Sequence, residues 1–236
     1  MIRRKITKAR AVVQQSMAKI FNTNHNHSIT EERTDKPPSR FFHSPLVLFT
    51  REILHNPRAM GAACPSSRKL SKALASFVPL DSQGFIVELG AGTGSISAAL
   101  LACGTPAERL ILVERSTKLV EYLRKQFPQA LVIEGDASHL NELLGNKAHQ
   151  VSVVVSGLPL RVFPVALVQS ILKQVDLLLP NGGLFIQFTY DLRGKMLHLP
   201  HHFHSIAHKF VWGNLPPARV DVYRNEKHKE NVQSVI

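Results

Sequence analysis

Cysteine is scarce in this sequence, and long uninterrupted apolar runs are missing from it. The two cysteines, Cys64 and Cys103, give neither a disulfide framework nor a CxxC metal pattern, so we expect a reducing, intracellular compartment. The most apolar stretch, residues 151–168, contains Arg161 and two prolines and falls short of the ~20 apolar residues that a spanning helix needs. No apolar segment follows the basic start of the chain, so a secretory signal peptide is not expected.

Acidic residues are also scarce. The 236 residues include 29 Lys and Arg but only 17 Asp and Glu, which gives a formal net charge of +12. The excess is concentrated in residues 1–80, which hold fourteen of the basic residues and four of the acids. A localised basic segment indicates an anionic partner, either a nucleic acid or a membrane surface.

Residues 1–38 are predicted to form a basic amphipathic helix and a polar linker. Within residues 2–21, apolar side chains recur every three or four positions, as they do on one face of a helix. Such a helix suits an anionic membrane surface, although a solvated terminal helix or an organellar transit peptide would have the same pattern. Residues 22–38 are polar and end in two prolines, which is typical of a linker.

Residues 39–225 are predicted to form one domain, followed by a flexible tail at residues 226–236. The first part of the domain, residues 39–80, is expected to be a helical cap. Within it, residues 41–54 form a second amphipathic segment that is rich in phenylalanine. This segment either packs on the core or dips into a membrane interface.

From residue 84 onward, apolar runs alternate with helical patterns. This alternation predicts a Rossmann-like α/β domain with a seven-stranded, mostly parallel sheet and an antiparallel last strand. The five parallel strands should be buried on both faces, because their apolar runs are nearly continuous. We expect strands at 85–89, 110–114, 130–134, 151–155, 184–189, 205–212 and 218–224, and helices at about 94–103, 116–126, 138–145 and 164–179.

The strongest motif is 86-IVELGAGTGS-95. The first strand ends in Glu88, and glycines follow at positions 90, 92 and 94, with Ala91 between the first two. Glycines here allow a tight turn and let a ligand approach the backbone, while the amides of the helix that follows favour an anionic group. The spacing differs from the GxGxxG dinucleotide fingerprint. It resembles the glycine loop of Rossmann-like S-adenosylmethionine methyltransferases, in which Glu88, Gly90, Ala91, Gly92 and Gly94 would bind the cofactor.

Two further acids end the next two expected strands. Glu114 lies about twenty residues past the loop, where a carboxylate can accept both ribose hydroxyls of a nucleoside. Asp136 ends the third strand and can face the adenine amine. Arg115 and Ala137, beside these acids, are assigned to the same site. An NAD enzyme or a ligand-free Rossmann domain remains an alternative.

The fourth strand ends in 156-SGLPL-160. This segment resembles the motif that amino-methyltransferases carry at the same position, Asn/Asp-Pro-Pro-Tyr or Asn-Leu-Pro-Tyr. In that motif a polar side chain and a backbone carbonyl accept hydrogen bonds from the target nitrogen. We therefore expect Ser156 Oγ and the carbonyls of Gly157 and Leu158 to be catalytic acceptors, with Ser156 also near the cofactor. Tyr190 would add a polar contact or an aromatic face against an ammonium. Leu160 replaces the aromatic that would stack on a nucleobase, which favours an aliphatic amine.

The chain resembles the bacterial phospholipid N-methyltransferases. The matching segments are 61-GAACPSS-67, 87-VELGAGTGS-95, 135-GDA-137, 156-SGLPL-160, 187-QFTY-190 and 212-WGNLPPARV-220. The resemblance implies methylation of phosphatidylethanolamine towards phosphatidylcholine, with S-adenosyl-L-methionine as cofactor. It also implies a peripheral location on the cytoplasmic face of the membrane, held to anionic lipid by the basic N-terminal region. We expect a monomer without a metal or a nucleic-acid partner.

Three other functions remain as alternatives. An RNA adenine N6-methyltransferase would suit the basic charge, but it conflicts with Leu160 and with the lack of a helical RNA-binding domain after the last strand. Ornithine-lipid N-methyltransferases resemble the same segments. An inactive, membrane-bound cofactor-binding protein would keep the fold without the activity.

Histidines cluster in 198-HLPHHFH-204. A metal site is one interpretation, but the spacing is not that of a helical pair and no acid or cysteine lies nearby in the sequence. We predict that this segment is a loop that faces either solvent or a phosphate group. Arg193 and Lys195 would either meet a lipid phosphate or be ordinary surface charges.

Overall fold

The structure of the protein, a computed structural model, describes residues 67–193 and 198–227. The chain divides into two compact units, Met1–Cys64 and Pro65–Ile236, and every described residue belongs to the second. The predicted basic helix at 2–21, the linker at 22–38 and the amphipathic segment at 41–54 lie outside the described residues, as does most of the predicted tail. The domain boundaries predicted from the sequence therefore stay predictions.

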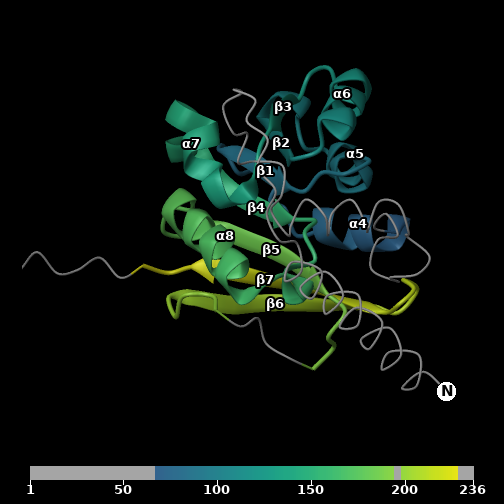
Figure 1. Ribbon diagram of the computed structural model, residues 1–236. Coiled ribbons are helices and arrows are strands. Elements are labelled where there is room, and N and C mark those ends of the chain that lie inside the picture. The colour runs from purple at the N-terminus through teal and green to yellow at the C-terminus, as the bar shows by residue number, and fades with distance from the viewer. Residues whose placement is uncertain (1–66, 194–197, 228–236) are drawn as a thin grey trace, which may run out of the picture. The chain divides into compact units, whose positions relative to one another are not determined.

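One seven-stranded sheet organises the described residues (Figure 1). Its strands follow the order β3-β2-β1-β4-β5-β7-β6, in which β7 pairs antiparallel with both β5 and β6 and all other pairs are parallel. The predicted fold class is confirmed. The strands are β1 Phe85–Leu89, β2 Leu110–Glu114, β3 Leu131–Glu134, β4 Val151–Ser156, β5 Leu184–Thr189, β6 Phe203–Val211 and β7 Ala218–Asn225.

Helices cover both faces of this sheet, which explains the continuous apolar runs of the central strands (Figure 1). One face packs against α4 (Arg68–Ala75), α5 (Ser95–Ala102) and α6 (Thr117–Gln126), and the other against α7 (Leu140–Leu144) and α8 (Val165–Leu178). Successive residues of a strand therefore enter different cores. None of the helices in the described part of the chain is both long enough and apolar enough to cross a bilayer.

Two elements differ from their predicted extent by more than one residue. Strand β6 begins at Phe203, two residues before the predicted start, because the Phe203 side chain is buried in the core on the α8 side. The helix predicted at 138–145 is divided into a 3₁₀ helix at Ala137–His139 and the short α7. The division follows from Asp136, whose carboxylate accepts the Ser138 amide at 2.9 Å and so caps the first of these turns.

The parallel strands place their carboxyl ends along a single edge of the sheet. Strand β6 also points to this edge, because it and β5 are both antiparallel to β7. In open α/β sheets, ligands bind outside this edge, at the point where strand order reverses. The loops after β1, β2, β3, β4 and β5 and the β6–β7 turn are therefore where the site must be built.

Candidate active site

The glycine loop after β1 has a backbone that only glycine adopts readily. Gly90, Gly92 and Gly94 have φ angles of 70°, 58° and 78°, all in the left-handed region. A side chain on Gly90 would collide with Leu158, and one on Gly94 with Phe127. The corresponding position on Gly92 faces only the Gly90 carbonyl oxygen, 3.9 Å away. The backbone at Gly92 is therefore open to a ligand, as the sequence predicts for the centre of a binding loop.

Glu114, at the end of β2, reaches across to this loop. Its Oε2 accepts the Gly92 amide at 2.9 Å, and its Oε1 accepts the amides of Arg115 and Ser116 at 2.9 Å each. Three backbone donors thus hold the carboxylate in a fixed orientation beside the open part of the loop. Carboxylate oxygens can each accept more than one hydrogen bond, so the predicted role of Glu114 towards ribose hydroxyls is compatible with this geometry.

Glu88 lies beneath the loop and is fully buried. Ser97 Oγ donates to its Oε2 at 2.6 Å, while its Oε1 has no hydrogen-bond partner among the described residues. Burial raises the pKa of Glu88 from its ordinary value of 4.5 to about 8; the bond from Ser97 lowers it in part, and the charge of Glu114 raises it further. Glu88 is therefore protonated at neutral pH, and its direct contact with a cofactor stays a prediction.

Asp136 and Arg115, both predicted for the cofactor site, meet at the ends of β3 and β2. Asp136 Oδ1 accepts the amide and the hydroxyl of Ser138 at 2.9 Å each, and Oδ2 lies 3.3 Å from Arg115 Nη1. Ala137 and Ala91 are buried next to these turns. The structure thus brings the predicted cofactor residues together along the carboxyl ends of β1, β2 and β3.

The loop after β4 packs directly on the glycine loop. Gly157 donates its amide to the Leu89 carbonyl at 2.8 Å, and a side chain at Gly157 would approach the Gly90 carbonyl to 2.9 Å. Leu158 covers Gly90 from the same side. The absence of a Cβ at Gly157 is therefore required by the close approach of the two loops, and the loop after β4 does border the cofactor loop as the sequence predicts.

Two side chains of this loop are buried in the structure. Ser156 has no exposed surface, and its Oγ accepts the Leu158 amide at 3.3 Å, so this hydroxyl shapes the turn and is not presented as an open acceptor. Leu160 is only 1% exposed and packs in the core with α8. The apolar side chain that remains near the surface of the loop is Leu158, which is partly buried.

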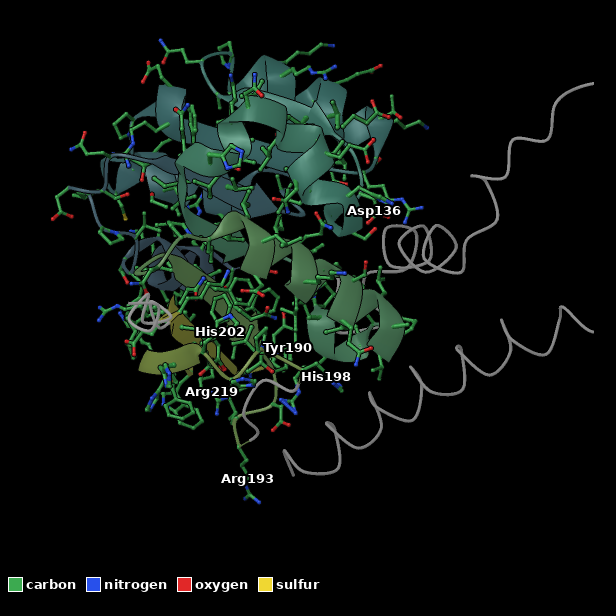
Figure 2. All side chains as sticks on the ribbon, turned by 90° about the vertical axis from the view of Figure 1, so that its left-hand side faces the viewer. Asp136, Tyr190, Arg193, His198, His202 and Arg219 are labelled. Carbon is green, nitrogen blue, oxygen red and sulfur yellow. The ribbon has the colours of Figure 1, made fainter. Side chains whose placement is uncertain are left out.

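Tyr190 follows β5 at the same edge and lies against Phe188 in an edge-to-face arrangement, with ring centroids 5.3 Å apart. Beyond it, Asp191 Oδ2 lies 2.9 Å from Arg161 Nη2, which ties the segment after β5 to the segment after β4. Figure 2 shows Tyr190 apart from Asp136, towards the part of the molecule that holds His198 and Arg219. An aromatic contact between Tyr190 and a substrate cation stays a prediction.

A buried polar row beside Ser156 was missed by the sequence reasoning. Ser156 lies opposite Gln187 of β5, and Gln187 lies opposite Asp221 of β7. Gln187 is 3% exposed; its Nε2 donates to the Phe188 carbonyl at 3.0 Å, and its Oε1 has no partner among the described residues. Polar residues at alternate positions of otherwise apolar strands were the signal that could have identified this row.

Arg219 and Thr189 extend this row towards the edge. Arg219 contacts Asp221 through Nε at 2.8 Å and through Nη2 at 2.9 Å, and Arg219 Nη1 donates to the Leu192 carbonyl at 3.0 Å. The paired guanidinium thus fixes the segment that follows Tyr190. Charged groups this deeply buried are normally found only when paired, as they are here.

The histidine segment is near an acid that the sequence could not locate. His202 Nε2 lies 2.7 Å from Asp176 Oδ1 of α8, and Lys227 Nζ lies 3.0 Å from the same oxygen. Burial alone would raise the pKa of Asp176, but the hydrogen bonds from His202 and Lys227 and their charges lower it below its usual value. No acid is close to these histidines in the sequence, but the fold brings Asp176 of α8 into contact with His202.

No group of metal ligands is formed among residues 67–193 and 198–227. His204 Nε2 lies 3.9 Å from a Glu226 carboxylate oxygen, which makes only a loose pair at the surface. Figure 2 shows Arg193 projecting away from the remainder of the described side chains, and Lys195 is outside the described residues. The predicted phosphate contact of Arg193 and Lys195 stays a prediction.

The fold and the loop geometry define a Rossmann-like methyltransferase. The methyltransferase domain family matches residues 86–183, which include the glycine loop, all three strand-end acids and the loop after β4. An ornithine lipid N-methyltransferase from Singulisphaera acidiphila is 31% identical over 175 residues, which are 72% of this chain and 91% of that protein. The chain therefore belongs to the family of S-adenosylmethionine-dependent methyltransferases that includes this enzyme.

Solved structures agree on the fold. TrmN from Thermus thermophilus is 21% identical with a TM-score of 0.54; the match covers 72% of this chain and 53% of that one. The putative methyltransferase yhhF from Escherichia coli is 16% identical with a TM-score of 0.55, over 70% of this chain and 89% of that one. At these identities the likeness supports the architecture alone.

The residues fit S-adenosyl-L-methionine, the cofactor of this class. The backbone at Gly92 is approachable, the Glu114 carboxylate is oriented beside it, and the buried Glu88 Oε1 is a polar atom without a partner among the described residues. A nucleoside with hydroxyls and a charged amino-acid portion offers donors for both carboxyl groups. The protein is thus a methyltransferase, and the residues predicted to bind its cofactor lie at the ends of β1, β2 and β3.

Proposed function

We propose that the protein transfers a methyl group from S-adenosyl-L-methionine to the amine head group of a membrane lipid, with phosphatidylethanolamine converted towards phosphatidylcholine. The observation that carries a lipid amine as the acceptor is the 31% identity to an ornithine lipid N-methyltransferase over 91% of that enzyme's length. The choice of phosphatidylethanolamine rests on the resemblance of the sequence segments to the phospholipid N-methyltransferases. The absence of an aromatic residue from the loop 157–160, which follows β4, also supports an aliphatic amine, because extruded nucleobases are held by stacking.

The amine must reach the site with its lone pair free. A lipid head-group amine resembles lysine and is mostly protonated near neutral pH, so the protein has to favour the neutral form. Bound S-adenosylmethionine supplies an electrophilic methyl group. The chain's contribution is to orient the nitrogen and to exclude water, since burial disfavours the charged ammonium and good orientation can contribute about 7–11 kcal/mol.

The acceptors that orient the amine come from the loop after β4 and from β5. The Leu158 carbonyl already accepts the Leu160 amide at 2.9 Å, and its second lone pair remains available. Ser156 holds this turn in shape. Gln187, the neighbour of Ser156 across the sheet, offers a buried side-chain oxygen without a partner among the described residues. We propose that the carbonyls of Gly157 and Leu158 and the side chain of Gln187 accept hydrogen bonds from the amine. Tyr190 would face the nitrogen of the head group.

An ornithine lipid is the second candidate substrate. The identity of the relative favours it, and its free amine makes the same chemical demand on the site as ethanolamine. The two head groups differ in the acid group that accompanies the amine, a phosphate in one and a free carboxylate in the other.

A labelled-methyl assay tests the proposed function. Purified full-length protein and methyl-labelled S-adenosylmethionine are incubated separately with phosphatidylethanolamine vesicles, ornithine-lipid vesicles and unmodified ribosomal RNA. We expect label in lipid, and the ratio between the two vesicle samples identifies the head group. Label in RNA but not in either lipid would overturn the proposal in favour of an RNA adenine methyltransferase. Label in none would favour a binding protein without activity.

Attachment to the membrane is part of the same proposal. We infer that the protein acts as a monomer. We also infer that it is held peripherally on the cytoplasmic face, because the basic residues that would attract anionic lipid are concentrated in the first third of the sequence. Removing residues 1–21 should weaken co-sedimentation with anionic vesicles, and the difference from the full chain should shrink as salt is added. Equal retention of both proteins at low salt would refute the role of that segment.

A further inference from the structure

The turn between β6 and β7 exposes large apolar side chains. Leu215 is 89% exposed and Trp212 is 68% exposed, although both belong to residue types that usually lose most of their surface on folding. Phe210 stacks on Trp212, with ring centroids 5.6 Å apart and an angle of 19° between the rings. The β6–β7 turn is thus an apolar tip, in which Phe210 and Trp212 pack on each other.

This tip lies on the side of the molecule where the active site is built. Strand β6 runs in the direction of β5, so its end is at the same edge as the ends of β1, β4 and β5. Figure 1 shows the yellow turn beside the end of α4. Across the strands, Thr189 lies opposite Arg219 and Arg219 lies opposite Phe210, so the tip continues from the polar row beside Tyr190.

Two lysines lie near the apolar tip. Lys69 of α4 lies against the turn, since a side chain on Gly213 would meet Lys69 Nζ at 2.6 Å. Lys209 is exposed on β6, next to Phe210. The sequence contains no Asp or Glu between residues 192 and 220, a stretch that also carries five histidines. This charge arrangement complements an anionic surface.

We propose that the β6–β7 turn, through Trp212 and Leu215, inserts into an anionic lipid bilayer and places the carboxyl edge of the sheet on the membrane. This inference rests on the proposed function, which requires the site to meet a lipid head group. Tryptophan is favoured at the boundary between head groups and acyl chains, because its ring is apolar and its N–H is polar. Neighbouring lysines add attraction to anionic head groups.

The single tryptophan of the chain makes a direct test possible, because intrinsic indole fluorescence reports on Trp212 alone. The full-length protein is mixed with vesicles of anionic phospholipid, with or without bromine on the acyl chains. We expect the emission to shift to shorter wavelength on binding and to be quenched by the brominated lipid. Protein that sediments with the vesicles while its emission is neither shifted nor quenched would overturn the proposal.

A matched pair of variants separates insertion from general effects on charge. Leu215→Asp removes an apolar contact at the tip, whereas Leu177→Asp makes the same change at a leucine that is 59% exposed near the end of α8. We expect Leu215→Asp to weaken vesicle binding by about tenfold, the equivalent of losing one buried leucine side chain, and Leu177→Asp to bind like the wild type. Equal binding by the two variants would contradict the proposal.

The two proposals can fail separately. If vesicles quench Trp212 but no lipid accepts a methyl group, the docking surface stands and the proposed function falls. If lipid is methylated, Leu215→Asp should lose activity on vesicles and keep it on a short-chain lipid dissolved below its micelle concentration. Equal losses on both acceptors would show that Leu215 does not act through the bilayer.

Discussion

Replacing Glu88 by glutamine should change how the stability of the protein depends on pH. In the folded chain the pKa of Glu88 is about 8, because the side chain is fully buried, against an ordinary value of 4.5. Between these two values the folded state keeps a proton that the unfolded state has released. The contribution of Glu88 to stability is therefore fully present below pH 4.5 and is lost as the pH rises towards 8.

The expected size follows from this shift. Between about pH 5.5 and about pH 7.5 the folded and unfolded states differ by nearly one proton, so Glu88 alone should lower the free energy of unfolding by about 2–3 kcal/mol. Glutamine cannot ionise, so this loss should be absent from Glu88→Gln. All other titratable groups are common to the two proteins, so their contribution cancels in the comparison.

Urea unfolding of both proteins at the two pH values measures the difference. The stability of the wild type should fall by about 2–3 kcal/mol more than that of Glu88→Gln. Glu121→Gln, on the exposed side of α6, is the control and should follow the wild type. Parallel pH dependence in the wild type and Glu88→Gln would refute the reasoning that Glu88 is protonated in the folded protein.

Two further substitutions test other parts of the account. Gly92→Val should abolish binding of S-adenosylmethionine in calorimetric titration and leave the chain folded. The control Gly182→Val, at another left-handed glycine with no neighbour within 4 Å, should bind the cofactor normally. Wild-type affinity in Gly92→Val would reject the assignment of this loop to the cofactor. Asp176→Asn should lower stability at neutral pH by roughly 1 kcal/mol, since it weakens contacts with His202 and Lys227, and this difference should vanish as the pH falls through the lowered pKa of Asp176. A difference that persists in acid, measured by denaturant unfolding, would rule out an ionic origin.

The positions of the strands and the cofactor side of the site follow from local sequence signals. Each central strand is a short apolar run with an acid, a serine or a threonine at its last or second-last residue, and the glycine loop has left-handed angles at the three positions where glycine recurs. Such signals involve residues that are close in the chain, so their geometry can be predicted without knowing the rest of the fold. The separate turn at Ala137–His139 was missed because a capping side chain, Asp136, interrupts the helical pattern.

The substrate side depends on contacts between distant segments and was predicted less well. Whether Ser156 faces a ligand or the protein is decided by Leu158, whose amide bonds to the serine hydroxyl, and by the approach of Gly157 to the β1 loop. The row from Ser156 through Gln187 to Asp221 exists only once β4, β5 and β7 have paired. Charge and apolar pattern identify such residues as unusual, but the pairing of strands determines where they meet.

Mass spectrometry of lipids tests the central claim most directly. The full-length protein and its Gly92→Val variant are each incubated with S-adenosylmethionine and vesicles that contain both phosphatidylethanolamine and ornithine lipid. The account predicts that the wild type alone converts a lipid to species heavier by successive methyl substitutions, with the added mass on the head-group amine. Unmodified amines in both lipids, with a cofactor-binding wild-type protein, would contradict the claim that this methyltransferase acts on a lipid amine.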